Sequence, residues 1–171
     1  MLFRSDITGH VIHLLMNGFA GEAQFVVLGT GAGEYEAMFA QMAGYHTQKM
    51  AAILEFNAAL APLIYAGSDM FIMPSLFEPC GLGQLIAMRY GSVPVVKETG
   101  GLADTVQDSV TGFSFRRHTV EDFWQAMRRA IYVYNADKDL WREIQRNGMT
   151  ADYSWERSAA EYVRQIGRAH V

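Results

Sequence analysis

The stretch from Ser68 to Asp104 (SDMFIMPSLFEPCGLGQLIAMRYGSVPVVKETGGLAD) constrains the fold of this chain more than any other. Its residues 69–73 are a short apolar run that ends at a proline, which is typical of a buried strand. Apolar residues then recur at three- and four-residue spacing over 80–90, which predicts a helix that ends at a glycine. Residues 92–96 (SVPVV) predict a second buried strand. A strand, a helix and a strand in this order form a βαβ unit with parallel strands and a right-handed crossover.

Two loops follow these predicted strands, over residues 74–79 (PSLFEP) and 97–104 (KETGGLAD). Loops that leave the carboxyl ends of parallel strands emerge at the same edge of the sheet, where open α/β sheets bind their ligands. We therefore expect Glu78, in the first loop, to lie near the pair Gly100 and Gly101, in the second.

The rest of the chain alternates between helical and extended patterns. Asn57, Thr119 and Ser154 are suited to cap the helices that follow them, and Pro62 should kink its helix or displace its start. The further helices are predicted over 7–19, 35–43, 58–66, 119–134, 137–149 and from 155 onward, and the further strands over 24–28, 50–56 and 112–115. This alternation, without an internal repeat, predicts one doubly wound α/β domain.

Composition excludes several classes of protein. The net charge of −4 and the isoelectric point near 5.7 give no electrostatic footprint for nucleic acid or an anionic membrane. The single cysteine, Cys80, excludes a disulfide within the chain and is compatible with a reducing compartment. No apolar run approaches the roughly 20 residues of a spanning helix, and the first residues contain no signal-peptide pattern. We therefore expect a cytoplasmic protein.

The two tips of the chain, residues 1–6 and 166–171, resemble the translation of non-native DNA. LFRS, at residues 2–5, and the final IGRAHV are what common sequencing-adaptor strings encode. We expect both tips to be non-native and exclude them from the fold. Residues 7–165 are then expected to be an internal piece of a longer protein; the alternative is a natural short protein with these termini.

The chemistry around Glu78 suggests a nucleotide sugar. The amides of Gly81, Leu82 and Gly83 are expected to point out of a helix N-terminus, which suits a phosphate group. A carboxylate beside that phosphate needs a different target, such as sugar hydroxyls or developing positive charge, and a sugar nucleotide offers both. The alternative is that Glu78 only caps its own helix.

A glycine-rich turn, Gly29-Thr30-Gly31, follows the predicted strand 24–28. The dinucleotide fingerprint G-x-G-x-x-G would need a glycine where Glu34 stands, so a nicotinamide enzyme is not favoured. The turn either lets a ligand approach the backbone or simply joins strand to helix. Phe56, at the end of another predicted strand, could stack on a ligand ring or pack in the core.

With these residues identified, the sequence resembles a known family. The segment PSLFEPCGLGQLIAMRYGSVPVVKETGGLADTV is similar to the hallmark of bacterial glycogen synthases and plant starch synthases. The resemblance continues upstream through FVVLGTG and LEFNAALAPLIYAGSDMFIMPS, and downstream through TGFSF and MTADYSWERSAAEY. It covers about residues 9–165, which is nearly everything outside the two tips.

The resemblance implies a GT-B-type glycosyltransferase, built from two facing Rossmann-like domains, of which this chain is the C-terminal, donor-binding one. The implied reaction transfers glucose from ADP-glucose to the non-reducing end of an α-1,4-glucan, with retention of configuration and without a metal or cofactor. It also implies that the first strand of this domain and the whole N-terminal acceptor domain lie upstream of residue 7. We therefore expect the isolated chain to be inactive.

The same resemblance implies roles for individual residues. Glu78 matches the family's essential glutamate, which supports the transition state at the donor sugar. Phe56 matches the aromatic residue that packs on adenine. The other matched donor-binding positions are Cys80, Gly81, Leu82 and Gly83 around the glucose and diphosphate, Thr99, Gly100 and Gly101 in the second glycine loop, and Gly29, Thr30 and Gly31 beside the nucleotide.

Three positions depart from the family pattern. Gly83 stands where a hydroxyl or larger side chain is common, Leu76 replaces a frequent arginine, and Pro62 replaces a usual histidine. Two rival functions also stay open. One is a related retaining glycosyltransferase that uses a UDP-sugar, similar to sucrose synthase. The other is a non-catalytic module that binds a nucleotide or glucan.

Overall fold

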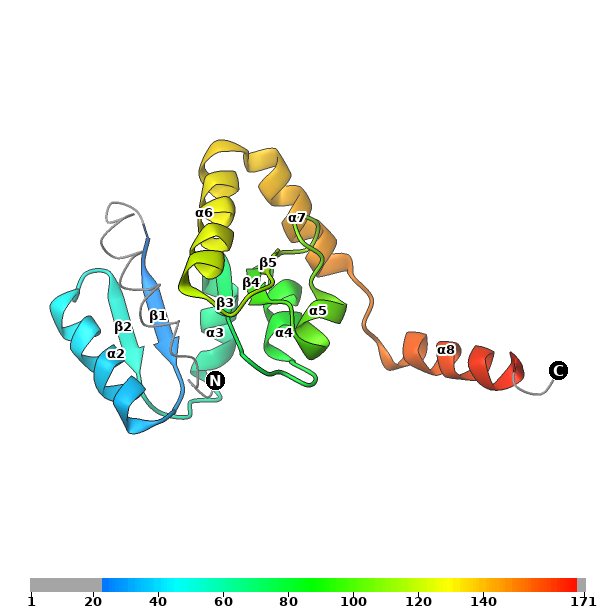
Figure 1. Cartoon of the computed structure of the whole chain (residues 1–171), viewed down its shortest axis with the longest axis horizontal. Helices are drawn as coiled ribbons and strands as arrows, with labels where there is room; N and C mark the ends of the chain where they lie inside the picture. Colours follow the sequence, from blue (N-terminus) through cyan, green and yellow to red (C-terminus); the bar gives the residue numbers. More distant parts are fainter. Residues whose placement is uncertain (1–22, 169–171) are drawn as a thin grey trace.

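The structure is a computed structural model that describes residues 23–168, in which strands and helices alternate (Figure 1). The predicted helix over 7–19 lies outside the described residues. The strands are β1 (Phe25–Leu28), β2 (Met50–Ile53), β3 (Met70–Met73), β4 (Val93–Lys97) and β5 (Phe113–Phe115). The helices are α2 (Gly33–Tyr45), α3 (Leu60–Gly67), α4 (Gly83–Arg89), α5 (Gly100–Thr105), α6 (Val120–Ala136), α7 (Lys138–Thr150) and α8 (Trp155–Arg168).

The described strands form two parallel sheets, β1-β2 and β3-β4-β5. β1 runs alongside β2 with Phe25 opposite Met50, and β3 runs alongside β4 with Met70 opposite Val93. β4 also pairs in parallel with β5. The predicted βαβ unit is therefore confirmed as β3-α4-β4, and so is the α/β class with parallel strands.

The larger hydrophobic core lies where α6 and α7 pack on β4 and β5. The rings of Phe115 and Phe123 are 5.2 Å apart between centroids, and those of Phe113 and Trp141 are 6.4 Å apart. Burying each such ring contributes about 1.5–3 kcal/mol to folding. The buried members of this core are Val93, Val95, Phe113, Phe115, Phe123, Ala126, Met127, Ala130, Trp141 and Ile144. The helix predicted over 119–134 therefore contributes one apolar face to this core.

A second, smaller core lies under α2. Its buried members are Val27 of β1, Phe39 of α2 and Met50 of β2. A third cluster lies in the β3-β4-β5 half and consists of Met73, Val96, Leu102 and Val106. Among residues 23–168, the β1-β2 half therefore has the smaller share of the buried core.

The predicted helix caps are present. Asn57 Oδ1 accepts a hydrogen bond of 2.9 Å from the Leu60 amide, Thr119 Oγ1 accepts from Asp122, and Ser154 Oγ accepts from Arg157. α3 begins two residues later than predicted. Pro62 therefore falls in its first turn, where a missing amide proton is tolerated.

Three expected boundaries are wrong. α4 begins at Gly83 and not at Cys80, because Gly81 has φ of +69°, a left-handed conformation that a helix cannot pass through. Pro79 consequently lies outside the helix. The expected loop over 97–104 contains the short helix α5. The strand predicted over 50–56 ends at Ile53, which leaves Phe56 in the following loop.

Helix α8 extends away from the rest of the described chain (Figure 1). It carries a series of exposed apolar side chains, namely Trp155, Tyr162, Val163 and Ile166. Among the helices of residues 23–168, none combines the length and the apolar character needed to cross a membrane.

Candidate functional site

The loops after β3 and β4 lie side by side, as the sequence predicted, and a backbone contact that it did not predict joins them. The Gly101 amide donates a hydrogen bond of 3.2 Å to the Glu78 carbonyl oxygen. A Cβ atom on Gly100 would collide with that same carbonyl, and one on Gly101 would collide with the carbonyl of Cys80. Both glycines are therefore required by the approach of one loop to the other, whatever ligand binds beside them.

Glu78 is partly buried, and its carboxylate lies against its own loop. Oε1 accepts a hydrogen bond of 3.2 Å from the Gly81 amide. The bond lies within the loop and is not the helix cap that the sequence left open as an alternative, because Gly81 precedes α4, whose N-terminus receives no side-chain capping bond. The Gly81 amide, expected to be free for a phosphate, is engaged in this form of the protein. At 3.2 Å the bond is at the long end of the range for N–H···O contacts.

Gln84 is a site residue that sequence reasoning missed. Its side chain is completely buried; Nε2 donates to the Gly81 carbonyl at 2.8 Å and to Thr105 Oγ1 at 3.1 Å. Thr105 in turn donates to the Gly101 carbonyl. Gln84 thus joins the glycine of the first loop to α5. The signal for it was a single amide side chain within an otherwise apolar helix pattern.

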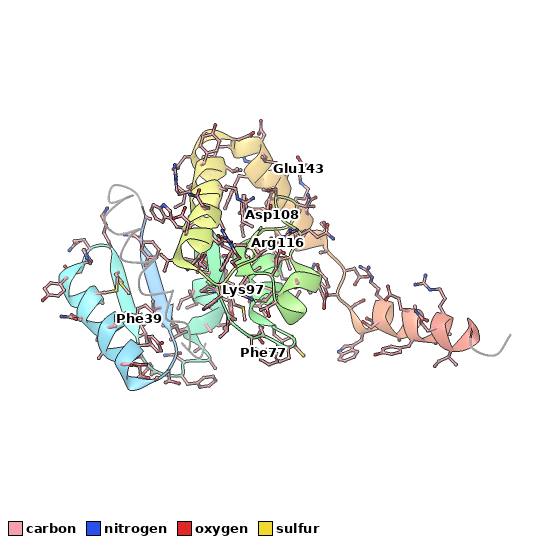
Figure 2. All side chains as sticks on the ribbon, viewed as in Figure 1. Phe39, Phe77, Lys97, Asp108, Arg116 and Glu143 are labelled. Carbon is pink, nitrogen blue, oxygen red and sulfur yellow. The ribbon has the colours of Figure 1, made fainter. Side chains whose placement is uncertain are left out.

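Two further side chains at this edge were also missed. Phe77 is 78% exposed in the loop after β3, and Lys97 is the last residue of β4; Figure 2 labels both. The signal for Phe77 was its place beside Leu76, since two adjacent apolar residues in a proline-bounded loop are not needed for a turn. Lys97 supplies positive charge at the carboxyl end of β4.

Three predicted donor-binding residues from separate segments of the chain line one large cavity. Gly29, Phe56 and Gly83 all border a space of about 1290 Å³. The Phe56 ring is 88% exposed, so it does not fill the core. Tyr65 also lines this cavity, and burial raises the pKa of its hydroxyl above the usual value.

The glycine turn after β1 leads into an acidic helix start. The Gly31 amide donates a hydrogen bond of 2.8 Å to Glu36, and Glu34 lies in the same first turn of α2. Two carboxylates at a helix N-terminus disfavour a phosphate there. The turn that includes Thr30 therefore lacks the chemistry of a dinucleotide site, which agrees with the incomplete fingerprint.

The remaining predicted residues lie around the first loop. Cys80 and Leu82 are exposed, and Thr99 Oγ1 donates to the Leu76 carbonyl at 3.5 Å. The structure thus gathers the predicted site into two groups. One surrounds Glu78, and the other surrounds Phe56. In the described part of the chain, no three His, Cys, Asp or Glu side chains are grouped so that they could hold a metal ion.

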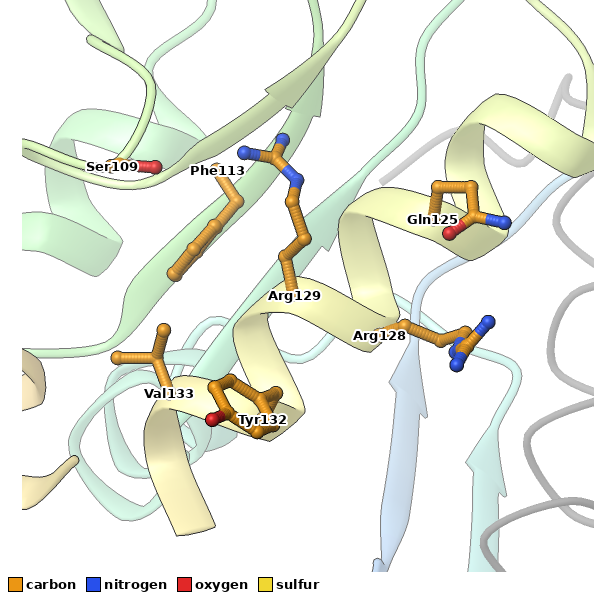
Figure 3. Close-up of a pocket in the computed structure, with 7 residues that line it drawn as sticks. All are labelled: Ser109, Phe113, Gln125, Arg128, Arg129, Tyr132 and Val133. Atoms are coloured by element: carbon orange, nitrogen blue, oxygen red, sulfur yellow. The ribbon is translucent and has the colours of Figure 1, made fainter. Parts of the chain in front are cut away.

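A smaller pocket of about 350 Å³ lies against α6, away from these loops (Figure 3). Its most prominent cation, Arg129, is already bonded to both carboxylate oxygens of Asp108, at 2.8 and 2.9 Å. None of the predicted site residues lines this pocket.

Comparison with known proteins identifies the class of protein that this fold and loop arrangement represent. Residues 8–132 match the family model for Glycosyl transferases group 1. The chain therefore belongs to the group 1 glycosyl transferases.

Named relatives make the similarity more specific. The chain is 47% identical to a glycogen synthase of Desulforudis audaxviator over 93% of its own length and 32% of that protein. It is 50% identical to a glycogen synthase of Bacillus cereus over 82% of its length and 31% of that protein. The catalytic domain of starch synthase IV from Arabidopsis thaliana, bound to ADP and acarbose, matches with a TM-score of 0.78 and 34% identity, over 96% of this chain and 36% of that one. The chain thus spans about a third of the length of these relatives.

Proposed function

We propose that residues 7–165 are the donor-binding, C-terminal domain of a glycogen or starch synthase. The full-length enzyme would transfer glucose from ADP-glucose to the non-reducing end of an α-1,4-glucan, with retention of configuration. The observation that carries this proposal is the similarity of nearly the whole chain to glycogen synthases and to a starch synthase with bound ADP. A cytoplasmic location is consistent with the two proposed substrates, a nucleotide sugar and a stored glucan.

Glu78 is the proposed catalytic residue. When the donor binds, its carboxylate leaves the long contact to the Gly81 amide and turns to the donor glucose. There it accepts hydrogen bonds from sugar hydroxyls and opposes the positive charge that develops at the anomeric carbon. The freed Gly81 amide then faces the diphosphate, together with the backbone of Leu82 and Gly83. Cys80 and the loop of Thr99, Gly100 and Gly101 border the sugar.

The nucleotide is proposed to lie on the β1-β2 side of the site. Phe56 presents an exposed ring on which adenine can stack. Gly29, Thr30 and Gly31 border the ribose rather than a phosphate, because Glu34 and Glu36 oppose an anion at the start of α2. The diphosphate then lies between the two groups, nearer to Gly83.

Glucan elongation by the full-length parent enzyme tests this proposal. We expect incorporation of glucose from ADP-glucose to exceed that from UDP-glucose, and a chelator to leave the rate unchanged. A preference for UDP-glucose would favour the related UDP-sugar transferase, and binding without any elongation would favour a non-catalytic module. The isolated 171-residue chain should not elongate glucan, because it spans only about a third of the length of the glycogen synthases that it resembles.

The substitution Glu78→Gln in the parent enzyme tests the proposed catalytic residue. We expect kcat to fall by about 10²–10³-fold or more, the effect of removing one group that stabilises a charged transition state. The Kd for ADP should change little. The matched control is Glu98→Gln, because Glu98 lies in the neighbouring loop but is bonded to Ser114 and Arg116. Equal losses of ADP affinity and rate at Glu78 would show that it only caps its loop.

A further inference from the structure

A tyrosine hydroxyl lies beside the glycine that begins α4. Tyr65 belongs to the last turn of α3, which packs against α4. A Cβ atom on Gly83 would lie 3.4 Å from the Tyr65 hydroxyl oxygen and 3.0 Å from the Phe71 ring. The space that a side chain at position 83 would need is therefore already occupied. Of the three atoms nearest to that position, the hydroxyl oxygen is the polar one.

Two aromatic contacts fix the direction of the Tyr65 side chain. Its ring is tilted against that of Phe71 of β3, with 5.3 Å between centroids. It also stacks on the ring of Tyr90, at 6.3 Å and with 13° between the ring planes. Tyr90 directly follows the last residue of α4, whereas Gly83 is the first. The side chain is thus held between the two ends of α4, with its hydroxyl at the end that adjoins the candidate site.

The Tyr65 hydroxyl is free to bind a ligand. Among residues 23–168, the Tyr65 backbone carbonyl accepts a hydrogen bond from Ser68 Oγ, but the hydroxyl has no partner. The residue is partly buried, and a tyrosine in such a place usually finds a partner for its hydroxyl. Burial also raises the pKa of this hydroxyl. It therefore stays protonated at neutral pH, where it can donate a hydrogen bond.

The place of this hydroxyl matches one part of a nucleotide sugar. Tyr65 and Gly83 line the cavity of about 1290 Å³ that Phe56 also lines. In the proposed arrangement the adenine lies on Phe56 and the glucose lies at Glu78, at opposite ends of the donor. The second phosphate, which carries the glucose, is then the one nearer to Gly83. Its oxygens are hydrogen-bond acceptors, and glycine has no side-chain donor to offer them.

We propose that Tyr65 is a further donor-binding residue, whose hydroxyl donates a hydrogen bond to the phosphate that carries the glucose. The inference rests on the proposed function, which places a diphosphate beside Gly83. Because Gly83 has no side chain, the hydroxyl from α3 reaches the start of α4 and supplies the contact that position 83 cannot make. Tyr65 thus adds a side-chain donor from a third segment to the loops after β3 and β4.

The substitution Tyr65→Phe in the full-length parent enzyme tests this contact, because it removes the hydroxyl and keeps both ring contacts. We expect the Kd for ADP to rise about 10–100-fold, as for the loss of a hydrogen bond to a charged group. The KM for ADP-glucose should rise by a similar factor. The Kd for AMP, which lacks the second phosphate, should change little. Isothermal titration calorimetry measures both dissociation constants.

Tyr90→Phe is the matched control. The Tyr90 ring stacks on that of Tyr65, but Tyr90 does not line the cavity. This variant should bind ADP and AMP as the wild type does. An unchanged Kd for ADP in Tyr65→Phe would overturn the proposal. Equal losses of ADP and AMP affinity would also overturn it, because they would show that Tyr65 shapes the cavity and does not contact the second phosphate.

Thermal unfolding of the parent enzyme gives a second measurement. Without ADP, Tyr65→Phe should unfold at nearly the same temperature as the wild type, because the hydroxyl has no partner to lose. With ADP, the rise in the unfolding midpoint should be smaller in the variant, since a weaker ligand stabilises the folded state less. A clear loss of stability without ADP would show that the hydroxyl bonds within the protein, and this would overturn the proposal.

Failure of this inference can be told apart from failure of the proposed function. If the wild-type parent binds ADP and elongates glucan but Tyr65→Phe binds ADP equally well, only the role of Tyr65 is refuted. If the wild-type parent does not bind ADP, the proposed function and the role of Tyr65 are refuted together.

Discussion

The two sheets that the described residues form both have parallel strands and flanking helices, but they differ in how many buried residues stabilise them. Among residues 23–168, ten buried residues form the main core of the β3-β4-β5 half and four more form a second cluster there, whereas three form the core of the β1-β2 half. The larger half carries Glu78 and the interlocked glycine loops, and the smaller half carries Gly29 and Phe56. The group proposed to do chemistry thus lies on the better-packed half. The group proposed to hold the nucleotide base lies on the half with the smaller buried core.

The largest expected effect comes from removing one buried phenylalanine ring from each half. Phe123→Ala should lower the free energy of unfolding by about 3–5 kcal/mol, because it leaves a cavity in the main core. Phe39→Ala deletes an equally buried ring but should open only the β1-β2 half. Amide exchange in the 171-residue chain measures this: Phe39→Ala should deprotect Val27 and leave Val95 protected. Equal deprotection of both amides would show that the halves unfold as one unit.

A smaller effect is expected where the two loops touch. Gly101→Ala places a Cβ atom against the Cys80 carbonyl, so the loops must separate at a cost of about 1–3 kcal/mol. Because Glu78 belongs to the displaced loop, kcat of the parent enzyme should fall as well. Urea unfolding and glucan elongation measure the two effects.

The matched control for this substitution is Gly33→Ala in the smaller half. A Cβ atom on Gly33 would meet no atom within 4 Å, and the residue begins helix α2. The free energy of unfolding of the Gly33→Ala variant should rise, and by no more than about 1 kcal/mol. A loss at Gly33 as large as that at Gly101 would refute the view that loop contact, rather than glycine as such, is required.

The sequence predicted some features of the β3-β4-β5 half and missed others. The strands and helices of the β3-β4-β5 half were predicted from local signals, such as the apolar run ended by Pro74 and the cap at Thr119. The approach of Glu78 to Gly100 and Gly101 followed from the βαβ connection. The sequence could not predict why glycine is required at these two positions, because the reason is a contact between loops more than 20 residues apart in sequence.

Other features depended on information that no local pattern contains. The start of α4 at Gly83 follows from the left-handed Gly81, and the end of β2 before Phe56 follows from where its pairing with β1 stops. The burial of Gln84 depends on α5, which the sequence reading treated as loop. The division of the described strands into two sheets is a property of long-range pairing, so the alternating pattern predicted the strands but not that division.

Gln84 offers a third test of the larger half, with a smaller expected effect. Gln84→Leu keeps a side chain of similar size but removes the bonds to Gly81 and Thr105, which should cost about 1–3 kcal/mol because buried polar groups lose their partner. If Gln84 positions the Gly81 loop, KM for ADP-glucose should rise in the parent enzyme. Gln125→Leu, on the exposed face of α6, is the control. A stability loss with unchanged KM would make Gln84 purely structural.

The smallest expected effect concerns the ion pair that fastens the segment before β5 to α6. Burial acts to raise the pKa of Asp108, but hydrogen bonds from Arg129 and from the Ser114 amide outweigh it and hold the pKa below its usual value of 3.8. A carboxylate with a lowered pKa in the folded state adds stability above the unfolded pKa. That stability is lost as the pH falls through the folded value.

The larger half should therefore weaken slightly below about pH 4, the usual titration range of an aspartate. Asp108→Asn should flatten this part of the stability profile measured by thermal unfolding, and should change stability at pH 7 by about 1 kcal/mol or less, because the pair is partly exposed. Asp139→Asn is the control, since its carboxylate is almost fully exposed and contacts Arg142 within one helix turn. An unchanged acid limb in Asp108→Asn would mean that the Arg129 contact holds the segment by packing alone. The stronger half would then owe its advantage to its core rather than to its charges.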